Sequence, residues 1–370
     1  MPESQTQKPV YYPDYLQLGK LLDSQLPKSI ATGKEAHDEM LFIIVHQAYE
    51  LWFKQILHEL KPVLAIFSKK SIEEHELGFI LARFERIIKI QDLLQKQLEV
   101  LETMTPMDFL EFRDLLIPAS GFQSVQFKTL ETLMGLTTNI RYTVDRDSFL
   151  GRLSPNDKKQ IEDLETQESL FTLLEKWLLR LPFTEKHNFI FWKQFESAVA
   201  TMLAKDSLII ENNPQTSEIE KKIQRDNLET TRRTFQSLFD EKIHDELVSN
   251  GHRRLDRKAI LSALFIFLYR YEPMMHLPFK VLNALIDIDE NFTSWRHRHS
   301  MMAHRMLGTK IGTGGTSGQD YLKKAADKNR VFLDLFNLST FIIPKSALPN
   351  LPEPLKQDLN FHYISKFNEA

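Results

Sequence analysis

The chain has 370 residues, of which 42% are hydrophobic and 26% charged, with a formal net charge of −3 and no cysteine. This length suffices for one large domain or two, and the small net charge gives no basic field that would favour nucleic acid as a partner. The lack of cysteine excludes disulfides, zinc-thiolate sites, iron–sulfur clusters and cysteine nucleophiles, and it fits a reducing compartment.

The N-terminal segment, MPESQTQKPVYYPDY, is polar and contains proline, so it does not have the pattern of a signal peptide. The most apolar run, residues 259–269, is too short to span a bilayer. We therefore expect a cytoplasmic protein with no membrane partner. Residues 1–15 are predicted to form an arm, because Tyr11, Tyr12 and Tyr15 cluster at the end of a polar tail and could dock on a neighbouring molecule or on the protein's own surface.

Helical patterns dominate the rest of the chain. Residues 38–60 are apolar on nearly all sides, which is typical of a buried helix, and Pro62 is expected to end or kink it. A capping-box pattern at 71–74 begins a long helix that reaches about residue 104. Prolines and glycines separate further helical patterns at 107–116, 157–181, 186–205, 216–249, 255–271, 278–290, 295–307 and 319–338.

No run of alternating β-branched residues predicts a strand, and the tail from Pro344 onward has four prolines and is expected to be irregular. We therefore predict an all-α fold of the helical-bundle type in a single domain, 1–370. Within it, the polar segment 140–255 is a candidate for a helical insertion.

Residues 295–318 hold three of the twelve histidines and five of the twelve glycines. Read as a helix, this stretch places His299 on an apolar stripe with Trp295, Met302 and Met306. The side opposite the stripe carries Arg296, His297, Ser300 and His304, and the two histidines there are expected to face water. His299 itself is either a core histidine satisfied by a hydrogen bond or a single imidazole offered to a metal caged elsewhere, as in haem.

The glycine-rich segment GTKIGTGGTSG that follows lacks the ending of a phosphate-binding P-loop and comes after a helix instead of a strand. It could be a ligand-gating loop or a plain surface loop.

A second histidine on an apolar stripe, His46, shares a helical face with Phe42, Tyr49 and Phe53, so its polar ring must meet a partner or a cavity. Two such imidazoles on separate helices could flank one planar cofactor, one of them as ligand.

Phe109 and Arg113 lie four residues apart on one predicted helical face. A guanidinium binds carboxylates in a bidentate manner, although a solvated surface arginine fits the pattern equally well.

The sequence does not contain the complete motifs of other metal sites or of hydrolases. A di-iron site needs two Glu-x-x-His motifs, and the chain has one, at Glu241 and His244. Neither a His-Glu-x-x-His motif nor a Gly-x-Ser-x-Gly elbow is present.

Four segments together resemble the tryptophan 2,3-dioxygenase family. They are HDEMLFIIVHQAYELWFKQILHEL (37–60), FRDLLIPASGFQS (112–124), YRYEPMMHLPFKVLNALIDIDENFTSWRHRHSMMAHRMLGTKIGTGGTSG (269–318) and VFLDLFNLSTFIIP (331–344). The similarity extends from Tyr12 to about Pro344 and is least clear over 137–255. It implies an all-helical haem enzyme, a homotetramer, that inserts O2 across the indole C2–C3 bond of L-tryptophan to give N-formylkynurenine, the first step of the kynurenine pathway.

The resemblance also implies a role for individual residues. It assigns His299 as the ligand of the iron of haem b, His46 as the hydrogen-bond partner of the indole N–H, Arg113 as the clamp on the substrate carboxylate, and Thr313 as a contact of the substrate's amino-acid end. Further expected contacts are Phe42 and Phe109 on the substrate side, Ser120 and Gly312 on the cofactor side, and Tyr12 and Tyr15 lent by a neighbouring subunit.

Four positions depart from common residues of the family: Met40, Val45, Phe109 and Thr316, the last in a loop that reads GTGGTSG where GTGGSSG is common. None of them removes a role named above, and Val45 and Phe109 bear on the expected shape of the pocket. Two other functions remain open, a related haem enzyme that oxidises another indole and a haem sensor without catalysis. Arg113 and Thr313 argue against the first, because an indole without an amino-acid end would not need them. The second leaves the substrate residues without a purpose.

Overall fold

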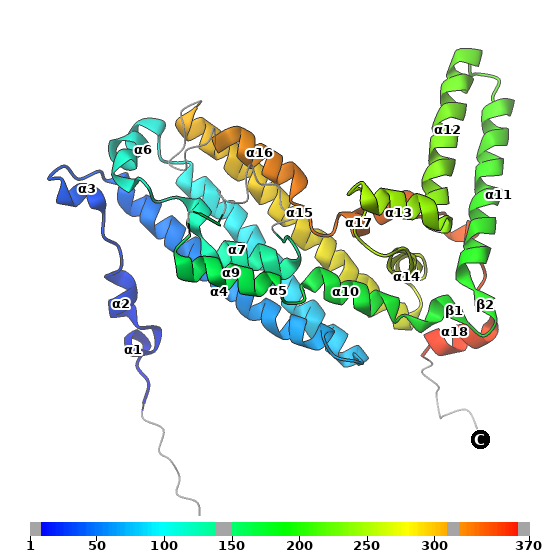
Figure 1. Ribbon diagram of the computed structural model, residues 1–370, viewed down its shortest axis with the longest axis horizontal. Helices are drawn as coiled ribbons and strands as arrows, with labels where there is room; N and C mark the ends of the chain where they lie inside the picture. Colours follow the sequence, from blue (N-terminus) through cyan, green and yellow to red (C-terminus); the bar gives the residue numbers. More distant parts are fainter. Residues whose placement is uncertain (1–8, 138–149, 152, 309–317, 362–370) are drawn as a thin grey trace, which may run out of the picture.

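The computed structural model describes residues 9–137, 150–151, 153–308 and 318–361, excluding the side chains of 318–321. The described chain is helical almost throughout (Figure 1), which confirms the predicted all-α class. One antiparallel hairpin of two-residue strands, β1 (Glu185–Lys186) and β2 (Phe189–Ile190), was not predicted. Two residues per strand are too few to show an alternating pattern.

The helices of the described residues follow one another along the chain. They are α1 (Tyr12–Leu16), α2 (Leu18–Leu22), α3 (Lys28–Ala31), α4 (Asp38–Phe67), α5 (Glu74–Leu101), α6 (Pro106–Phe112), η1 (Arg113–Leu116), η2 (Gly121–Gln123), α7 (Val125–Met134), α9 (Pro155–Glu165), α10 (Leu170–Leu179), η3 (Pro182–Thr184), α11 (Phe191–Asn212), α12 (Glu218–Phe239), α13 (Glu241–Ser249), α14 (Arg257–Leu268), α15 (Pro273–Leu307), α16 (Gly318–Lys328), α17 (Leu333–Phe336), η4 (Asn337–Phe341), η5 (Lys345–Ala347) and α18 (Glu353–Leu359).

The core lies among the three longest helices, α4, α5 and α15, which run side by side in Figure 1. Helix α15 packs against α5 on one side and α16 on another, while α4 packs against α5 and α7. Apolar residues of α5 recur every three or four positions, and Ile80, Phe84, Ile87, Leu94 and Leu98 are at most 2% exposed. This spacing forms one apolar stripe along the helix and explains how α5 packs against both neighbours.

Two prolines do not interrupt their helices. Helix α15 runs from Pro273 to Leu307 through Pro278, where the sequence predicted a break, and α4 continues five residues beyond Pro62. An internal proline costs about 3 kcal/mol. Both helices are long, and each buries ten or more side chains, so tertiary packing outweighs this local cost.

Side-chain caps set several boundaries differently from the sequence prediction. Helix α5 begins at Glu74 with a capping box between Glu73 and Glu76, not at residue 71. The predicted helix 216–249 is two helices, because the carboxylate of Asp240 accepts hydrogen bonds from the first turn of α13. The predicted helix 157–181 is also divided, and Ser169 caps its second part. The tail after 344, expected to be irregular, contains η5 and α18.

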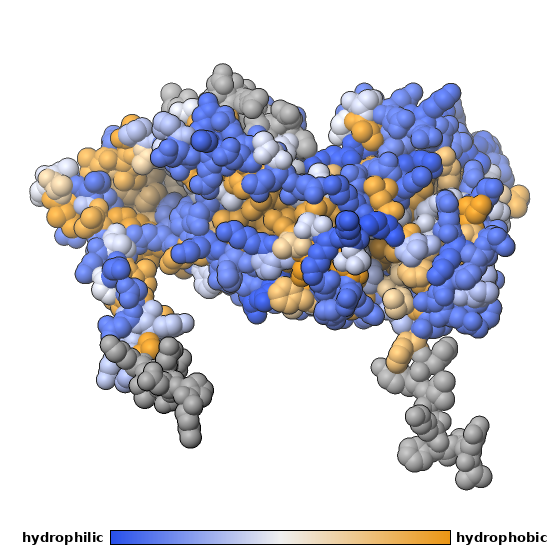
Figure 2. Space-filling model, turned by 60° about the horizontal axis from the view of Figure 1, so that its bottom comes forward, coloured by the Kyte–Doolittle hydropathy of each residue, from blue (hydrophilic) through white to orange (hydrophobic). Residues whose placement is uncertain are grey.

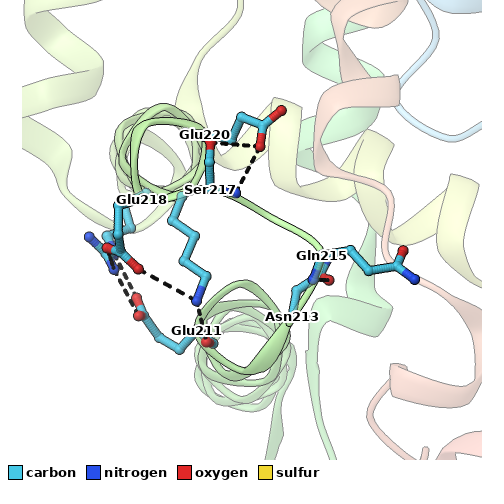
Figure 3. Close-up of polar contacts among 8 residues, drawn as sticks. Glu211, Asn213, Gln215, Ser217, Glu218 and Glu220 are labelled. Atoms are coloured by element: carbon cyan, nitrogen blue, oxygen red, sulfur yellow. Dashed lines mark hydrogen bonds and ion pairs between the residues drawn. The ribbon is translucent and has the colours of Figure 1, made fainter.

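Helices α11 and α12 form a long hairpin that projects away from the bundle (Figure 1). At the tip, shown in Figure 3, Arg225 donates from Nε and Nη2 to the two carboxylate oxygens of Glu211 at 2.7 and 2.8 Å. Ser217 and Glu220 form the capping box that begins α12. The polar residues of this part of the chain therefore lie on helix surfaces that face water. Its origin as an insertion stays a prediction.

The N-terminal helices α1 to α3 extend from one end of the bundle (Figure 1). Tyr12 and Tyr15 in this arm are 70% and 75% exposed. Figure 2 shows hydrophobic surface on the same end of the molecule, where α3, α4 and α6 leave Ile30, Ile44 and Met107 exposed. None of the described helices is long and apolar enough to cross a membrane.

Candidate functional site

A cavity of about 340 Å³ lies among α4, α5, α6, α7, α15 and α16. Its wall is mainly apolar and includes Phe53, Leu98, Phe127, Met302 and Met306. Five residues proposed from the sequence as site residues also line it: Phe42 and His46 from α4, Phe109 from α6, Ser120 before η2, and His299 from α15. The fold thus brings these five residues, which are spread from position 42 to position 299, to one apolar cavity. Two of them are histidines, and they come from different helices.

His46 borders the open part of this cavity. Its Nδ1 lies 2.7 Å from the backbone oxygen of Phe42. Because a carbonyl oxygen can only accept, Nδ1 must carry the hydrogen and donate it, which leaves Nε2 as an acceptor. His46 lines the cavity and is exposed. Burial lowers the pKa of His46, and the bond to Phe42 and the nearby charge of Glu50 partly oppose this shift. The ring is therefore neutral near pH 7.

His299 lies on the stripe that the sequence predicted, next to Trp295, Met302 and Met306. Its ring is parallel to that of Trp295, with centroids 5.3 Å apart and planes 5° apart. Burial lowers its pKa to about 4, with a smaller contribution from repulsion by His46 when that ring is protonated. His299 is therefore an unprotonated imidazole at neutral pH, which is the form that binds metals.

The side chains around His299 show what kind of metal or cofactor the cavity could bind. Within the described part of the chain there is no cluster of three or more His, Cys, Asp and Glu side chains that could cage a metal ion. A metal at His299 would therefore need ligands from a cofactor, and a porphyrin supplies four. The neutral His299, the apolar wall and the second imidazole of His46 across the cavity fit a haem.

Phe109 and Arg113 are placed differently with respect to the cavity. Phe109 lines it, with its ring centroid 5.7 Å from that of Phe42. Arg113 begins η1, one residue after α6 ends, and its Nη1 donates to Asp114 at 3.2 Å. Its side chain is only 14% exposed, and it is absent from the cavity wall that the described residues form. The structure thus keeps Arg113 one helical turn from Phe109, with a backbone hydrogen bond between them, but outside the cavity wall.

The remaining predicted site residues lie elsewhere. Gly312 and Thr313 fall outside the described residues. Tyr12 and Tyr15 are exposed on the arm and are not part of the cavity wall of their own chain. A contribution from these tyrosines to a site would require a neighbouring molecule.

Comparison with known proteins decides the family. Residues 2–342 match the family model described as tryptophan 2,3-dioxygenase. The chain belongs to this family. It is 48% identical to the tryptophan 2,3-dioxygenase of Alteromonas mediterranea over 96% of this chain and 98% of that protein. Its identity to the tryptophan 2,3-dioxygenase of Bdellovibrio bacteriovorus is also 48%, over 96% and 99% of the two chains. The mouse protein of the same name is 43% identical over 97% of this chain and 88% of its own length.

A polar corner of the cavity was missed from the sequence. Arg296 is 8% exposed, and its Nη2 donates to Glu131 of α7 at 2.7 Å while its Nη1 donates to the backbone oxygen of Asn329 at 2.9 Å. All three residues line the cavity. The helical periodicity put Arg296 and Ser300 opposite the apolar stripe, but this side of α15 is covered at both positions. The available signal was a charged residue that follows Trp295 directly in the sequence.

The two other histidines in the C-terminal part of α15 behave differently from Arg296. His304 is exposed, and His297, whose side chain is 43% exposed, lies 3.3 Å from Asp327 of α16. The prediction that they face water is confirmed. Of the three histidines in this part of α15, only His299 faces the cavity.

Proposed function

We propose that this protein is a haem-dependent dioxygenase that inserts O2 across the indole C2–C3 bond of L-tryptophan and releases N-formylkynurenine, the first step of the kynurenine pathway. Family membership supports the reaction. One structural observation supports its location: His46 and His299 face a single apolar cavity from two helices. Since the cavity collects five of the residues expected to act, we take it as the active site.

In this proposal His299 binds the iron of haem b, with Ser120 and Gly312 at the cofactor's edge. The low pKa of His299 favours this role, because no proton has to be displaced from the ring at neutral pH. When bound, the ferrous haem supplies the activation of O2, which reacts only slowly with ordinary organic molecules. The protein has to bind the substrate, orient it and exclude water.

The indole ring would be bound by Phe42, Phe109 and His46. The two phenylalanines offer apolar surface to the ring, and His46 offers Nε2 as an acceptor for the indole N–H, because its Nδ1 hydrogen is already donated to the backbone. This hydrogen bond would fix which edge of the indole faces the cofactor. His46 orients the substrate in this account and does not need to remove a proton.

The amino-acid end of the substrate would be bound by Arg113 and Thr313. A guanidinium has five N–H donors and can bind a carboxylate through two of them. Because Arg113 is outside the cavity wall and pairs with Asp114, we propose that it turns toward the substrate carboxylate on binding.

We also propose a cytoplasmic homotetramer in which the arm of one subunit places Tyr12 and Tyr15 at the cavity of another. The arm leaves both tyrosines more than two-thirds exposed, and apolar surface remains on α3, α4 and α6 nearby. Exposed apolar surface of this kind marks interaction sites.

The test is to incubate the purified, haem-loaded and reduced protein with O2 and L-tryptophan and to detect N-formylkynurenine by mass spectrometry. Absence of this product from protein with a normal haem spectrum would contradict the proposal. The position of Arg113 favours one second candidate, oxidation of an indole without a carboxylate. Tryptamine in parallel separates the two functions, because it keeps the indole and the amine and lacks the carboxylate.

A further inference from the structure

Trp295 and His299 form a stack that the helix alone does not dictate. Residues four apart on α15 lie on the same face, but the terminal torsion of aromatic and imidazole rings is broad, so many relative orientations are open to them. The observed planes differ by only 5°. Contacts with other residues must therefore hold one of the two rings in this orientation.

Trp295 is held by a second helix. Its Nε1 donates to the hydroxyl of Tyr49 on α4 at 3.4 Å, and that hydroxyl donates to the backbone oxygen of Leu94 on α5 at 2.6 Å. Phe53 meets the indole ring edge-on, and the centroid of Phe127 lies 5.3 Å from it. Burial raises the pKa of Tyr49 to about 12, so its hydroxyl stays protonated and can keep both hydrogen bonds.

His299 itself has no comparable anchor. A metal-binding histidine usually donates its second ring N–H to a carboxylate, a carbonyl or a water, and this bond fixes the ring. Among the residues that the structure describes, His299 has no side-chain or backbone hydrogen-bond partner. Within the described part of the chain, the stack with Trp295 is therefore the contact that can set its plane.

We propose that Trp295 is a positioning residue that sets the plane of the His299 imidazole, and that Tyr49 fixes Trp295. The inference rests on the proposed function, in which His299 binds haem iron. Tyr49 lies three residues after His46 on α4. The helix that carries His46 therefore also holds Trp295, and a shift of α4 relative to α15 would turn the His299 ring.

The test compares the reduced, haem-loaded variants Trp295→Leu, Trp295→Phe and Tyr49→Phe with the wild type. Resonance Raman spectroscopy of the iron–histidine stretching band reports the geometry of the iron–imidazole bond, and transfer of haem to an excess of apomyoglobin reports haem retention. The controls are Tyr269→Phe and Trp177→Leu. Tyr269 is as buried as Tyr49, at 7%, and donates to the backbone oxygen of Pro349 at 2.7 Å, but it lies outside the cavity wall.

We expect Trp295→Leu to shift and broaden the iron–histidine band and to release haem roughly 2- to 10-fold faster, as expected for loss of one aromatic stack. Trp295→Phe should restore part of the wild-type band, because it keeps a ring but loses the N–H donor. Tyr49→Phe should broaden the band, and both controls should leave it unchanged.

An unchanged band in Trp295→Leu would overturn the inference and leave the proposed function intact. The same holds if Tyr269→Phe or Trp177→Leu altered the band as much as the test variants, because the effect would then be general destabilisation. A wild-type protein without an iron–histidine band would overturn both the inference and the role of His299.

Discussion

The buried ion pair between Arg296 and Glu131 should contribute strongly to stability, and Glu131→Gln tests this. Nη2 of Arg296 lies 2.7 Å from the Glu131 carboxylate, and both side chains are 9% exposed. The substitution keeps the shape of the side chain and removes its charge. It leaves the guanidinium of Arg296 in a nearly dry environment with the backbone oxygen of Asn329 as an acceptor.

The magnitude follows from burial. Removing one partner of a buried ion pair costs about 3–5 kcal/mol, because the remaining charge stays without compensation. The pair of Arg225 and Glu211 (Figure 3) is a matched control, since it has the same 2.7 Å separation while both side chains are 45% exposed. We expect Glu211→Gln to cost only about 0–1 kcal/mol, because water solvates the remaining charge.

Urea unfolding of both apoprotein variants at neutral pH, fitted with a common slope, gives the two free energies. A loss of less than about 1 kcal/mol in Glu131→Gln, or equal losses in the two variants, would refute the reasoning from burial. The double variant Glu131→Leu with Arg296→Met should recover much of the lost stability, because it leaves no buried charge behind.

Three further predictions concern the site. His299→Ala should lose haem during gel filtration, and normal haem content with a wild-type spectrum would disprove the ligand assignment. Arg113→Ala should keep haem and raise the KM for L-tryptophan roughly 30-fold or more, whereas an unchanged KM would place the carboxylate elsewhere. Apoprotein stability should fall by about 3 kcal/mol between pH 6.5 and 4, because the unfolded chain protonates His299 in this range while the native ring, with its pKa lowered to about 4, does not. His299→Leu should lack this component in urea titrations, and an identical pH profile would contradict it.

The sequence alone was sufficient for features that depend on neighbours along the chain. A helix repeats every 3.6 residues, so the spacing placed His299 on one stripe with Trp295, Met302 and Met306, and the structure confirms that these side chains share the cavity wall. The same rule put His46 beside Phe42 on one face. The long family motifs indicated the reaction without any knowledge of the fold.

Helix boundaries required the tertiary structure. Pro278 lies inside α15 instead of breaking it, because packing along 35 residues outweighs the local cost. The length of a helix is a balance between local propensity and the apolar surface that distant segments cover. A sequence pattern shows only the first of these.

The surroundings of His299 were decided by residues far away in the sequence. Periodicity placed Arg296 away from the stripe, but α7 and the segment around Asn329 cover that side, and the ion pair with Glu131 joins residues 165 positions apart. The hydrogen bond from Trp295 to Tyr49 spans 246 positions. Local patterns indicate which way a side chain points along its own helix. Which surface it meets there depends on how the helices pack against one another, and that is where burial, ion pairing and the plane of the His299 ring are determined.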